Sequence, residues 1–267
     1  MPPEPAPTHG TPPGPASLTG ARRGSVLVTG ASRGLGAEIA RRLGADGWPV
    51  AVNYLPDPEG AERVVADILA AGGTAAAFRA DVTDETAVAN LIPAVRDVLG
   101  PVRVLIPNAT GPQPVRAALD LTWQDHLDQL LFFVKSPTLL MRAAVPDMSR
   151  LGGGRIIHVG SDLPERAEPG MSAYSAAKSA QLSLTRTWAR ELGPLGITVN
   201  LVAPGWIPVE RHAGIPADQI EGYRRDVPLG RMGTPAEVAD VVAFLASDGS
   251  RFITGERIAV NGGHTLT

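Results

Sequence analysis

The sequence predicts an α/β fold, a single doubly wound parallel sheet of about seven strands with helices on both faces. Three observations lead to this prediction. Short apolar runs alternate with longer amphipathic segments, the runs are mostly apolar and do not alternate with polar residues, and a glycine-rich turn joins the first run to the first amphipathic segment. A strand that is apolar on both sides is buried on both sides, as in a parallel sheet covered by helices.

Each predicted strand is a short run of four to six residues, rich in β-branched or small side chains. In chain order the predicted strands are residues 25–29, 50–53, 74–79, 103–106, 155–159, 197–202 and 257–260. The segments between them predict helices at 34–45, 59–71, 84–99, 123–149, 173–192 and 235–246. The last of these begins at Pro235, which suits a first helical turn because its missing N–H would have no partner there.

The composition is that of one large α/β unit with a separate N-terminal segment. The chain has 267 residues, of which 44% are hydrophobic, enough for a sizeable core. Residues 1–20 alternate prolines with small and polar residues, so we expect a disordered tail there and one α/β domain at 21–267.

Charge and residue usage exclude several classes of function. The net charge of -3 implies no broad field for nucleic acid or membranes. Without cysteine there is no disulfide, thiolate metal site or cysteine nucleophile, and the 5 histidines lack metal-ligand spacing, so no metal is expected. No apolar run reaches the roughly 18–20 residues of a membrane span, and no signal-like segment precedes the first strand. We therefore expect a cytoplasmic protein.

A glycine-rich turn, Thr-Gly-Ala-Ser-Arg-Gly-Leu-Gly at 29–36, lies between the first strand and the first helix. Glycines let the backbone approach a pyrophosphate, and the helix N-terminus offers N–H groups and the positive end of its dipole. Such a turn can serve packing alone, but the strand–turn–helix context favours a dinucleotide. The contacts expected from this turn are Gly30, Ser32, Arg33, Gly34, Leu35 and Gly36.

The residues after the second strand decide between the two nicotinamide dinucleotides. An Asp or Glu there would bind both ribose hydroxyls and select NAD, whereas this chain has Asn53, which does not repel a 2′-phosphate. Arg33 could reach that phosphate from the glycine turn, although a loop arginine is often simply solvated. Asp57 and Glu59 nearby argue mildly the other way. We expect NADP(H) to be preferred, with NAD(H) not excluded.

Two further strand ends are expected to border the cofactor, because ligands of open parallel sheets bind beyond the carboxyl ends of the strands. Asp81 and Val82 follow the third strand, where the Asp81 carboxylate could accept a hydrogen bond from the adenine amino group. Asn108 and Ala109 follow the fourth strand, where the backbone should pass beside the ribose.

The chain contains two lysines, and one of them, Lys178, lies four residues after Tyr174. Arginine can replace lysine on a surface, but not easily where a compact ammonium must touch a phenol and a sugar hydroxyl together. On a helix, Tyr174 and Lys178 share one face, an arrangement that is also common on exposed helices. Ser161 lies upstream at a spacing that suits a Ser-Tyr-Lys catalytic set.

Taken in order, the glycine turn, Asn108-Ala109, Ser161 and the Tyr-Ser-Ala-Ala-Lys run at 174–178 resemble the short-chain dehydrogenase/reductase family. The resemblance covers about residues 24–264 and points more narrowly to the 3-oxoacyl-carrier-protein-reductase-like group. It implies a Rossmann-type dinucleotide-binding catalytic domain at 21–267. Its motifs are specific for fold and cofactor class and poorly specific for substrate.

The resemblance implies a role for each member of the set. Tyr174 would protonate the carbonyl oxygen as hydride arrives, or act as the base in oxidation, and Ser161 would hold that oxygen. Lys178 would bind the nicotinamide ribose and lower the pKa of Tyr174. A cation about 4 Å away, at an effective dielectric of about 20, is worth roughly 4 kcal/mol, which would bring the phenol from a pKa of about 10 toward neutrality. The residues expected to wall the nicotinamide are Pro204, Gly205 and Ile207.

The sequence departs from the family pattern in the long helix after the fourth strand. The family usually has a catalytic asparagine there, which supports a water relay returning a proton to the tyrosine. Two alignment registers place either Phe133 or Leu130 at that position. Gln129 could substitute in part, and Lys135 should point away as a surface or subunit-contact residue. A smaller departure is Val209, where a threonine commonly contacts the nicotinamide carboxamide.

The sequence therefore predicts an NADP(H)-dependent ketoreductase or alcohol dehydrogenase acting on a small carbonyl or alcohol substrate, free or carrier-bound. A lid over the substrate is expected at 206–228, with apolar residues and several arginines. The missing asparagine keeps open a cofactor-binding sensor or assembly protein with little turnover, and dehydration or epimerisation on the same fold is a third alternative. By resemblance we expect a homotetramer or homodimer, with no nucleic acid or membrane as partner.

Overall fold

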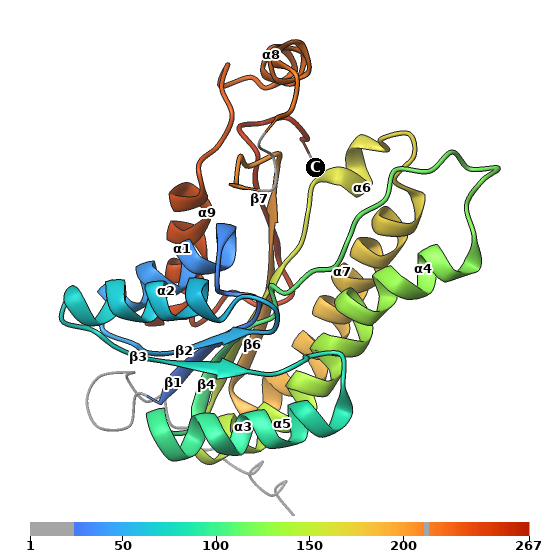
Figure 1. Cartoon of the computed structure of the whole chain (residues 1–267). Coiled ribbons are helices and arrows are strands. Elements are labelled where there is room, and N and C mark those ends of the chain that lie inside the picture. The colour runs from blue at the N-terminus through green and yellow to red at the C-terminus, as the bar shows by residue number, and fades with distance from the viewer. Residues whose placement is uncertain (1–23, 211–213, 267) are drawn as a thin grey trace, which may run out of the picture.

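The computed structural model describes residues 24–210 and 214–266 (Figure 1). The tail predicted at 1–20 lies outside these residues, as do Arg211 and His212 of the predicted lid. The described residues form a seven-stranded sheet in which all neighbouring strands are parallel, in the order β3-β2-β1-β4-β5-β6-β7. The strands are β1 (Ser25–Val28), β2 (Pro49–Tyr54), β3 (Thr74–Arg79), β4 (Val102–Ile106), β5 (Gly154–Val159), β6 (Ile197–Pro204) and β7 (Arg257–Val260).

The strand order reverses at β1, which has β2 on one side and β4 on the other. Val26 is in register with Val50 of β2 and with Val104 of β4. From β1 the chain builds the sheet outward in one direction and then returns to build it in the other. A crevice for a ligand is expected at such a switch point, beyond the carboxyl ends of β1 and β4.

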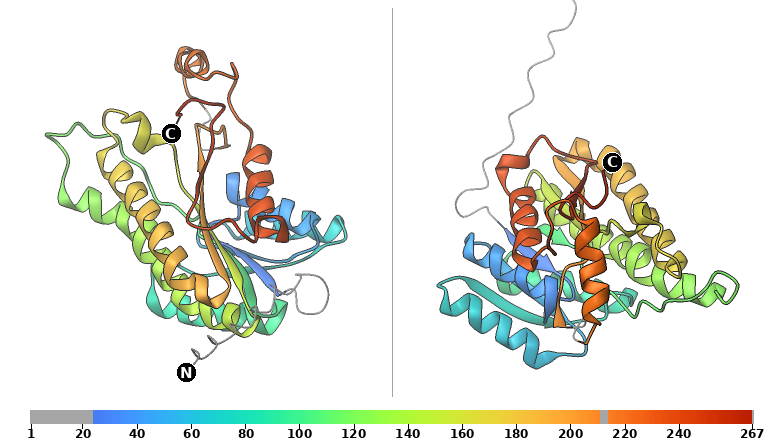
Figure 2. Two further views of the ribbon diagram at one scale, coloured as in Figure 1. Left: turned by 180° about the vertical axis from the view of Figure 1, so that it is seen from behind. Right: turned by 90° about the horizontal axis from the view of Figure 1, so that it is seen from above.

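Helices cover both faces of the sheet (Figures 1 and 2). The pattern of β1 shows why, since Val26 and Val28 belong to one hydrophobic core while Leu27 between them belongs to the other. The helices of the first core are α1 (Gly34–Ala45), α2 (Pro58–Ala70) and α9 (Pro235–Ala246). Those of the second are α3 (Glu85–Leu99), α5 (Ser136–Arg150) and α7 (Ser172–Leu192). The predicted doubly wound α/β fold is confirmed.

The long helix predicted at 123–149 contains a wider turn. It begins as α4 (Trp123–Leu130), continues as one π-helical stretch, η1 (Leu131–Lys135), and resumes as α5. Pro137 gives a physical reason, because it has no N–H for the carbonyl of Phe133 and its ring crowds that carbonyl. The Ser136 N–H instead reaches back to the Leu131 carbonyl, five residues earlier.

Among the α-helices of residues 24–210 and 214–266, four begin with a side chain that accepts a hydrogen bond from a first-turn N–H, as cap residues do. These N-caps are Asp57 of α2, Asp84 of α3, Thr122 of α4 and Thr234 of α9. The N-cap of α1 is Arg33, whose side chain makes no capping bond. In α1, the helix that follows the glycine turn, no N-cap carboxylate or hydroxyl therefore accepts a hydrogen bond from the first N–H groups.

Two short helices of the structure were not predicted, α6 (Leu163–Arg166) and α8 (Ala217–Asp226). The first is a single turn, and the second buries one side chain, Tyr223, so neither shows an apolar period. Short 3₁₀ turns, η2 (Gly193–Leu195) and η4 (Asp248–Ser250), follow α7 and α9. Within 24–210 and 214–266, no helix is both long enough and apolar enough to pass through a membrane.

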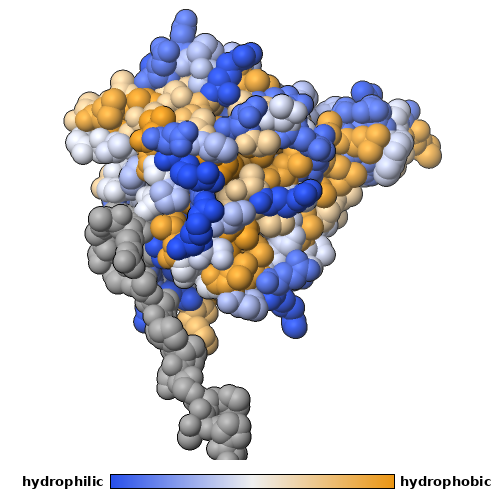
Figure 3. Space-filling view, turned by 90° about the horizontal axis from the view of Figure 1, so that it is seen from below, coloured by the Kyte–Doolittle hydropathy of each residue, from blue (hydrophilic) through white to orange (hydrophobic). Residues whose placement is uncertain are grey.

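The part of the underside that is visible in Figure 3 mixes hydrophilic and hydrophobic residues. Such a mixture is ordinary for a solvated protein surface. Because ligands of doubly wound sheets bind beyond the carboxyl ends of the strands, the functional site is expected at the opposite side, beneath α6 and α8.

Candidate active site

A cleft of about 1780 Å³ opens at the carboxyl ends of the strands, at the switch point of the sheet. Every site residue predicted from the sequence lines it. These residues are Gly30, Ser32, Arg33, Gly34, Leu35, Gly36, Asn53, Asp81, Val82, Asn108, Ala109, Ser161, Tyr174, Lys178, Pro204, Gly205 and Ile207. A cavity of this size, open at the first βα turn, has room for an extended dinucleotide and a small substrate.

The glycine turn is shaped by close backbone approaches. Gly30 and Gly34 have φ of 61° and 57°, a region that favours glycine. A Cβ on Gly30 would lie 2.8 Å from the Ala109 Cα, and one on Gly36 would lie 2.5 Å from the Gly30 carbonyl oxygen. The turn thus brings backbone to the cleft, and the uncapped first turn of α1 offers its N–H groups there. This combination fits a pyrophosphate.

Thr29 and Asn108 join the ends of β1 and β4. The Asn108 amide nitrogen donates to the carbonyls of Thr29 at 2.9 Å and Gly30 at 3.2 Å. The backbone N–H groups of Asn108 and Ala109 donate to the Thr29 hydroxyl at 2.9 and 3.0 Å. Asn108 therefore supports the glycine turn from behind, and Thr29 is a supporting residue that the sequence motif did not single out.

Ser161, Tyr174 and Lys178 meet in the same cleft. Ser161 lies just after β5, and its Oγ accepts a hydrogen bond from the Leu163 N–H at 3.1 Å, so its own proton is directed elsewhere. Tyr174 and Lys178 lie one turn apart on α7. The Lys178 ammonium nitrogen is 5.7 Å from the centroid of the Tyr174 ring. The structure thus places a hydroxyl, a phenol and an ammonium around one cavity.

Sequence comparison agrees with this geometry. The family described as enoyl-(acyl carrier protein) reductase matches residues 30–265. The chain belongs to the short-chain dehydrogenase/reductase family. The 3-oxoacyl-[acyl-carrier-protein] reductase of Staphylococcus aureus (strain N315) is 39% identical over 232 residues, which are 86% of this chain and 93% of that protein. That of Pseudomonas aeruginosa is 37% identical over 232 residues, 86% of this chain and 92% of its own.

Solved structures of the family superpose closely on this chain. A double mutant of a Serratia marcescens short-chain dehydrogenase/reductase has a TM-score of 0.84 and 34% identity, covering 91% of this chain and 98% of its own. The promiscuous reductase LugOII, which catalyses keto-reduction at C1 during lugdunomycin biosynthesis, has a TM-score of 0.85 and 36% identity. The match covers 94% of this chain and all of LugOII.

Relative to the family pattern, the main departure of this member is Phe133. Of the two positions predicted for the missing asparagine, Phe133 is 2% exposed on η1 and lines the cleft, whereas Leu130 is not among the residues that line it. The ring stands edge-on to Tyr174, with centroids 5.4 Å apart. Gln129 donates to the Pro112 carbonyl at 2.8 Å, and Lys135 is exposed, as predicted.

The side chain of Asn53 turns into the protein. It is 2% exposed, its Oδ1 accepts from the Gly30 N–H at 3.3 Å, and its amide nitrogen donates to the carbonyls of Phe78 and Ala80. Asn53 therefore borders the cleft while bracing the glycine turn. The two carboxylates whose presence mildly favoured NAD are engaged elsewhere, because the Asp57 side chain caps α2 and the Glu59 side chain pairs with Arg63.

Asp81 is held by the residue two positions later. Its Oδ1 accepts hydrogen bonds from the Thr83 N–H at 2.8 Å and from the Thr83 hydroxyl at 2.7 Å. This pair of bonds fixes the carboxylate at the rim of the cleft, where Thr83 also lies. Thr83 is a second supporting residue that could have been anticipated, because Asp-x-Thr commonly forms such a local turn.

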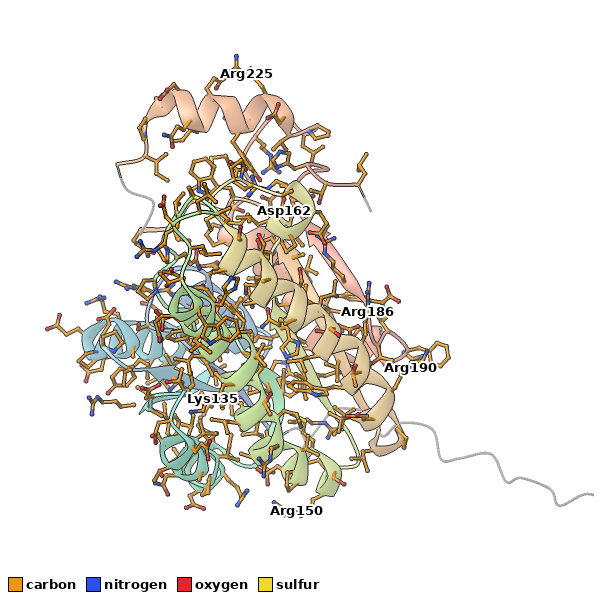
Figure 4. All side chains as sticks on the ribbon, turned by 90° about the vertical axis from the view of Figure 1, so that its right-hand side faces the viewer. Lys135, Arg150, Asp162, Arg186, Arg190 and Arg225 are labelled. Atoms are coloured by element: carbon orange, nitrogen blue, oxygen red, sulfur yellow. The ribbon has the colours of Figure 1, made fainter. Side chains whose placement is uncertain are left out.

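The predicted lid is attached to the cleft through Tyr223, the buried side chain of α8. Its hydroxyl accepts from the Trp206 N–H at 2.8 Å, and its ring packs edge-on against Trp206 and His264. Burial raises the pKa of Tyr223, so the phenol stays protonated. Near it, the fully buried carboxylate of Asp162 accepts from Arg166 at 3.2 Å and from Asn261 at 3.1 Å (Figure 4).

None of these lid contacts was predicted. Asp162 directly follows Ser161, but a lone acidic residue after a strand has many roles, and its partners come from α6 and from the segment after β7. Tyr223 stands in a helix without apolar periodicity. The sequence predicted a lid at 206–228, and it carried no signal that Tyr223 would anchor this segment.

Proposed function

We propose that this chain is an NADP(H)-dependent ketoreductase, an oxidoreductase that transfers hydride between nicotinamide and a carbonyl or secondary alcohol with Tyr174 as general acid and base. The observation that carries the proposal is the joint position of Ser161, Tyr174 and Lys178 in a cleft whose other end is an uncapped helix N-terminus and a glycine turn. Membership of the short-chain dehydrogenase/reductase family supports it.

The residues of this chain supply the proton chemistry. A nicotinamide bound in the cleft supplies or accepts the hydride. During reduction the Tyr174 hydroxyl would donate its proton to the carbonyl oxygen, and the Ser161 hydroxyl would donate a hydrogen bond to the same oxygen. The positive charge of Lys178 stabilises the phenolate that remains on Tyr174. During oxidation of an alcohol, each of these steps runs in reverse.

The preference for NADP(H) follows from the charges near the second strand. The cleft residues at the end of β2 are Asn53, Tyr54, Leu55 and Pro56, which are all uncharged. Arg33 is exposed and also lines the cleft. A 2′-phosphate would meet a guanidinium and no carboxylate from this strand end, whereas the 2′-hydroxyl of NAD(H) would lack the carboxylate that usually binds it.

The substrate end of the cleft favours an apolar carbonyl compound. Its walls include Val115, Phe132, Met171, Trp206 and Ile215. The lid arginines within the described residues do not point into it, because Arg224 pairs with Glu221 and Arg225 points outward from α8 (Figure 4). The relatives from Staphylococcus aureus and Pseudomonas aeruginosa are named as 3-oxoacyl-[acyl-carrier-protein] reductases, and an acyl chain on a carrier is one substrate that these walls would suit.

We also propose assembly into a homotetramer or homodimer through the long helices. Trp123, Leu127 and Leu131 recur every four residues along α4 and η1, and they are 69%, 37% and 36% exposed. An apolar stripe at this spacing is suited to packing against the same stripe of a second copy. Light scattering on the purified chain tests this, with a monomer as the contradicting result.

The proposed function is tested with NADPH and NADH against a panel of ketones and the corresponding alcohols. Tyr174→Phe keeps the ring against Phe133 and removes the acidic proton, so kcat should fall about 100- to 10,000-fold while NADPH binding by fluorescence is retained. Unchanged turnover in this variant would refute the assigned chemistry. NADPH binding without turnover of any substrate would instead support a cofactor-binding protein, and turnover without net cofactor use a dehydratase or epimerase.

A further inference from the structure

Gln181 lies three residues after Lys178 on α7, and its side chain is 1% exposed. Its Oε1 accepts a hydrogen bond from the Lys178 ammonium at 3.2 Å. A buried ammonium is costly unless acceptors surround it, and a buried amide must likewise find a partner. An amide oxygen supplies an acceptor for the ammonium without adding a negative charge, so the positive field of the ammonium is not reduced.

The ammonium is held from three directions. The Val159 carbonyl at the end of β5 accepts from it at 2.6 Å, Gln181 accepts at 3.2 Å, and the ring of Phe133 on η1 lies with its centroid 3.7 Å away. A cation over an aromatic face at this distance is attracted by the ring. Groups from β5, from η1 and from α7 itself therefore determine together where the charge lies relative to Tyr174.

The histidine next to Gln181, His158, adds no second charge there. The Thr185 hydroxyl donates to the Gln181 backbone carbonyl at 2.9 Å, so in its 2.7 Å contact with His158 it must accept, and the proton lies on His158 Nδ1. Burial, and then the charge of Lys178, lower the pKa of His158 to about 3. The imidazole is thus neutral, and the charge of Lys178 acts on Tyr174 without competition from it.

We infer that Gln181 is a positioning residue for the proposed reaction: its side-chain oxygen, together with the Val159 carbonyl, clamps the Lys178 ammonium over the ring of Phe133 and so fixes the charge that Tyr174 experiences. The inference rests on the proposed function, because it concerns how Lys178 serves Tyr174. The clamp itself can nevertheless be observed without measuring enzymatic activity.

The clamp can be observed directly because the chain contains two lysines. Selective ¹³C labelling of lysine gives two Cε–H signals, and Lys135→Arg assigns them. Lys135 is exposed and serves as an internal reference. The Lys178 signal should be displaced upfield, because its ammonium end lies over the face of Phe133.

Gln181→Leu removes the acceptor and keeps the volume of the side chain. We expect the Lys178 signal to move toward that of Lys135, and kcat for carbonyl reduction to fall about tenfold, the effect of losing one hydrogen bond to a charged group. Gln181→Glu keeps an acceptor oxygen, so the displaced signal should persist. Its carboxylate offsets part of the positive field, so the pH–rate profile of alcohol oxidation should move to higher pH, with activity recovered there.

The matched control is Gln129→Leu, which removes a buried amide that bonds to the Pro112 carbonyl. It should lower the melting temperature without moving the Lys178 signal. A Gln181→Leu variant that is merely less stable, with an unmoved Lys178 signal and an unchanged pH profile, overturns the inference. Absence of turnover in the wild-type chain would contradict the proposed function instead, and the lysine spectra would still decide whether the clamp exists.

Discussion

Gly36 is the position at which one methyl group should do most harm to the cofactor end of the cleft. A Cβ there would lie 2.5 Å from both the Asn108 amide nitrogen and the Gly30 carbonyl oxygen. Ordinary contact begins near 3.4 Å, so α1 and the β4 end would have to separate by roughly 0.9 Å. That movement stretches the two hydrogen bonds from the Asn108 amide to the Thr29 and Gly30 carbonyls.

The magnitude for Gly36→Ala follows from three contributions. Two weakened hydrogen bonds cost about 2 kcal/mol, and overpacking costs about 1–3 kcal/mol. The better helix propensity of alanine returns about 1 kcal/mol. We expect a net loss of about 2–4 kcal/mol in the free energy of unfolding, measured by urea denaturation, and a weaker NADPH complex measured by fluorescence titration.

Gly222→Ala is the matched control, because a Cβ at that position of α8 meets nothing within 4 Å. The same substitution should there stabilise by up to about 1 kcal/mol. The two substitutions should therefore change the free energy of unfolding in opposite directions. The reasoning is refuted if Gly36→Ala is as stable as the wild type and binds NADPH with the same Kd, since the close approach would then not constrain the turn.

Three further outcomes are expected. Arg33→Ala should lower the ratio of kcat/KM for NADPH over NADH about tenfold, and an unchanged ratio would remove Arg33 from the cofactor site. His158 has a pKa of about 3 in the folded chain and near 6.5 when unfolded, so the unfolded state binds more protons between these values. Stability should therefore fall as the pH drops through this window, by at most about 5 kcal/mol, and His158→Gln should flatten the dependence in urea titrations. Asp147 is fully buried and accepts from Arg96 and from the Val102 N–H. Asp147→Asn should cost about 2 kcal/mol, a modest value because Arg96 can turn to water, and equal stability would show that the pair contributes nothing.

Local features of this chain were predictable because they depend on neighbours in sequence. Apolar runs marked the seven strands, and the spacing of Tyr174 and Lys178 placed both on one helical face. The glycine turn followed from the strand–turn–helix order, and the cleft includes all of its predicted contacts. Each of these depends on periodicity or on backbone chemistry, and both are visible in a single segment.

Other features came from packing between segments. Asn53 was predicted as a residue of the cofactor site on its charge alone, whereas the structure uses its amide to brace the glycine turn. The π turn at η1 could not be predicted from a helical period, although Pro137 offers its cause in retrospect. That turn accompanies the placement of Phe133 in the cleft, against Tyr174 and Lys178.

The sequence by itself determined the parallel α/β sheet and the family of this protein, because short-range patterns of apolar residues and glycines specify strands, helices and the turn between them. The sequence also predicted the proposed reacting groups, Ser161, Tyr174 and Lys178, from their types, their spacing and the family resemblance. Only the tertiary structure decided what surrounds the ammonium of Lys178. Gln181 lies one turn away on the same helix, but Val159 and Phe133 come from β5 and η1. Their convergence on the ammonium depends on how strand and helices pack, which no single segment of the sequence encodes.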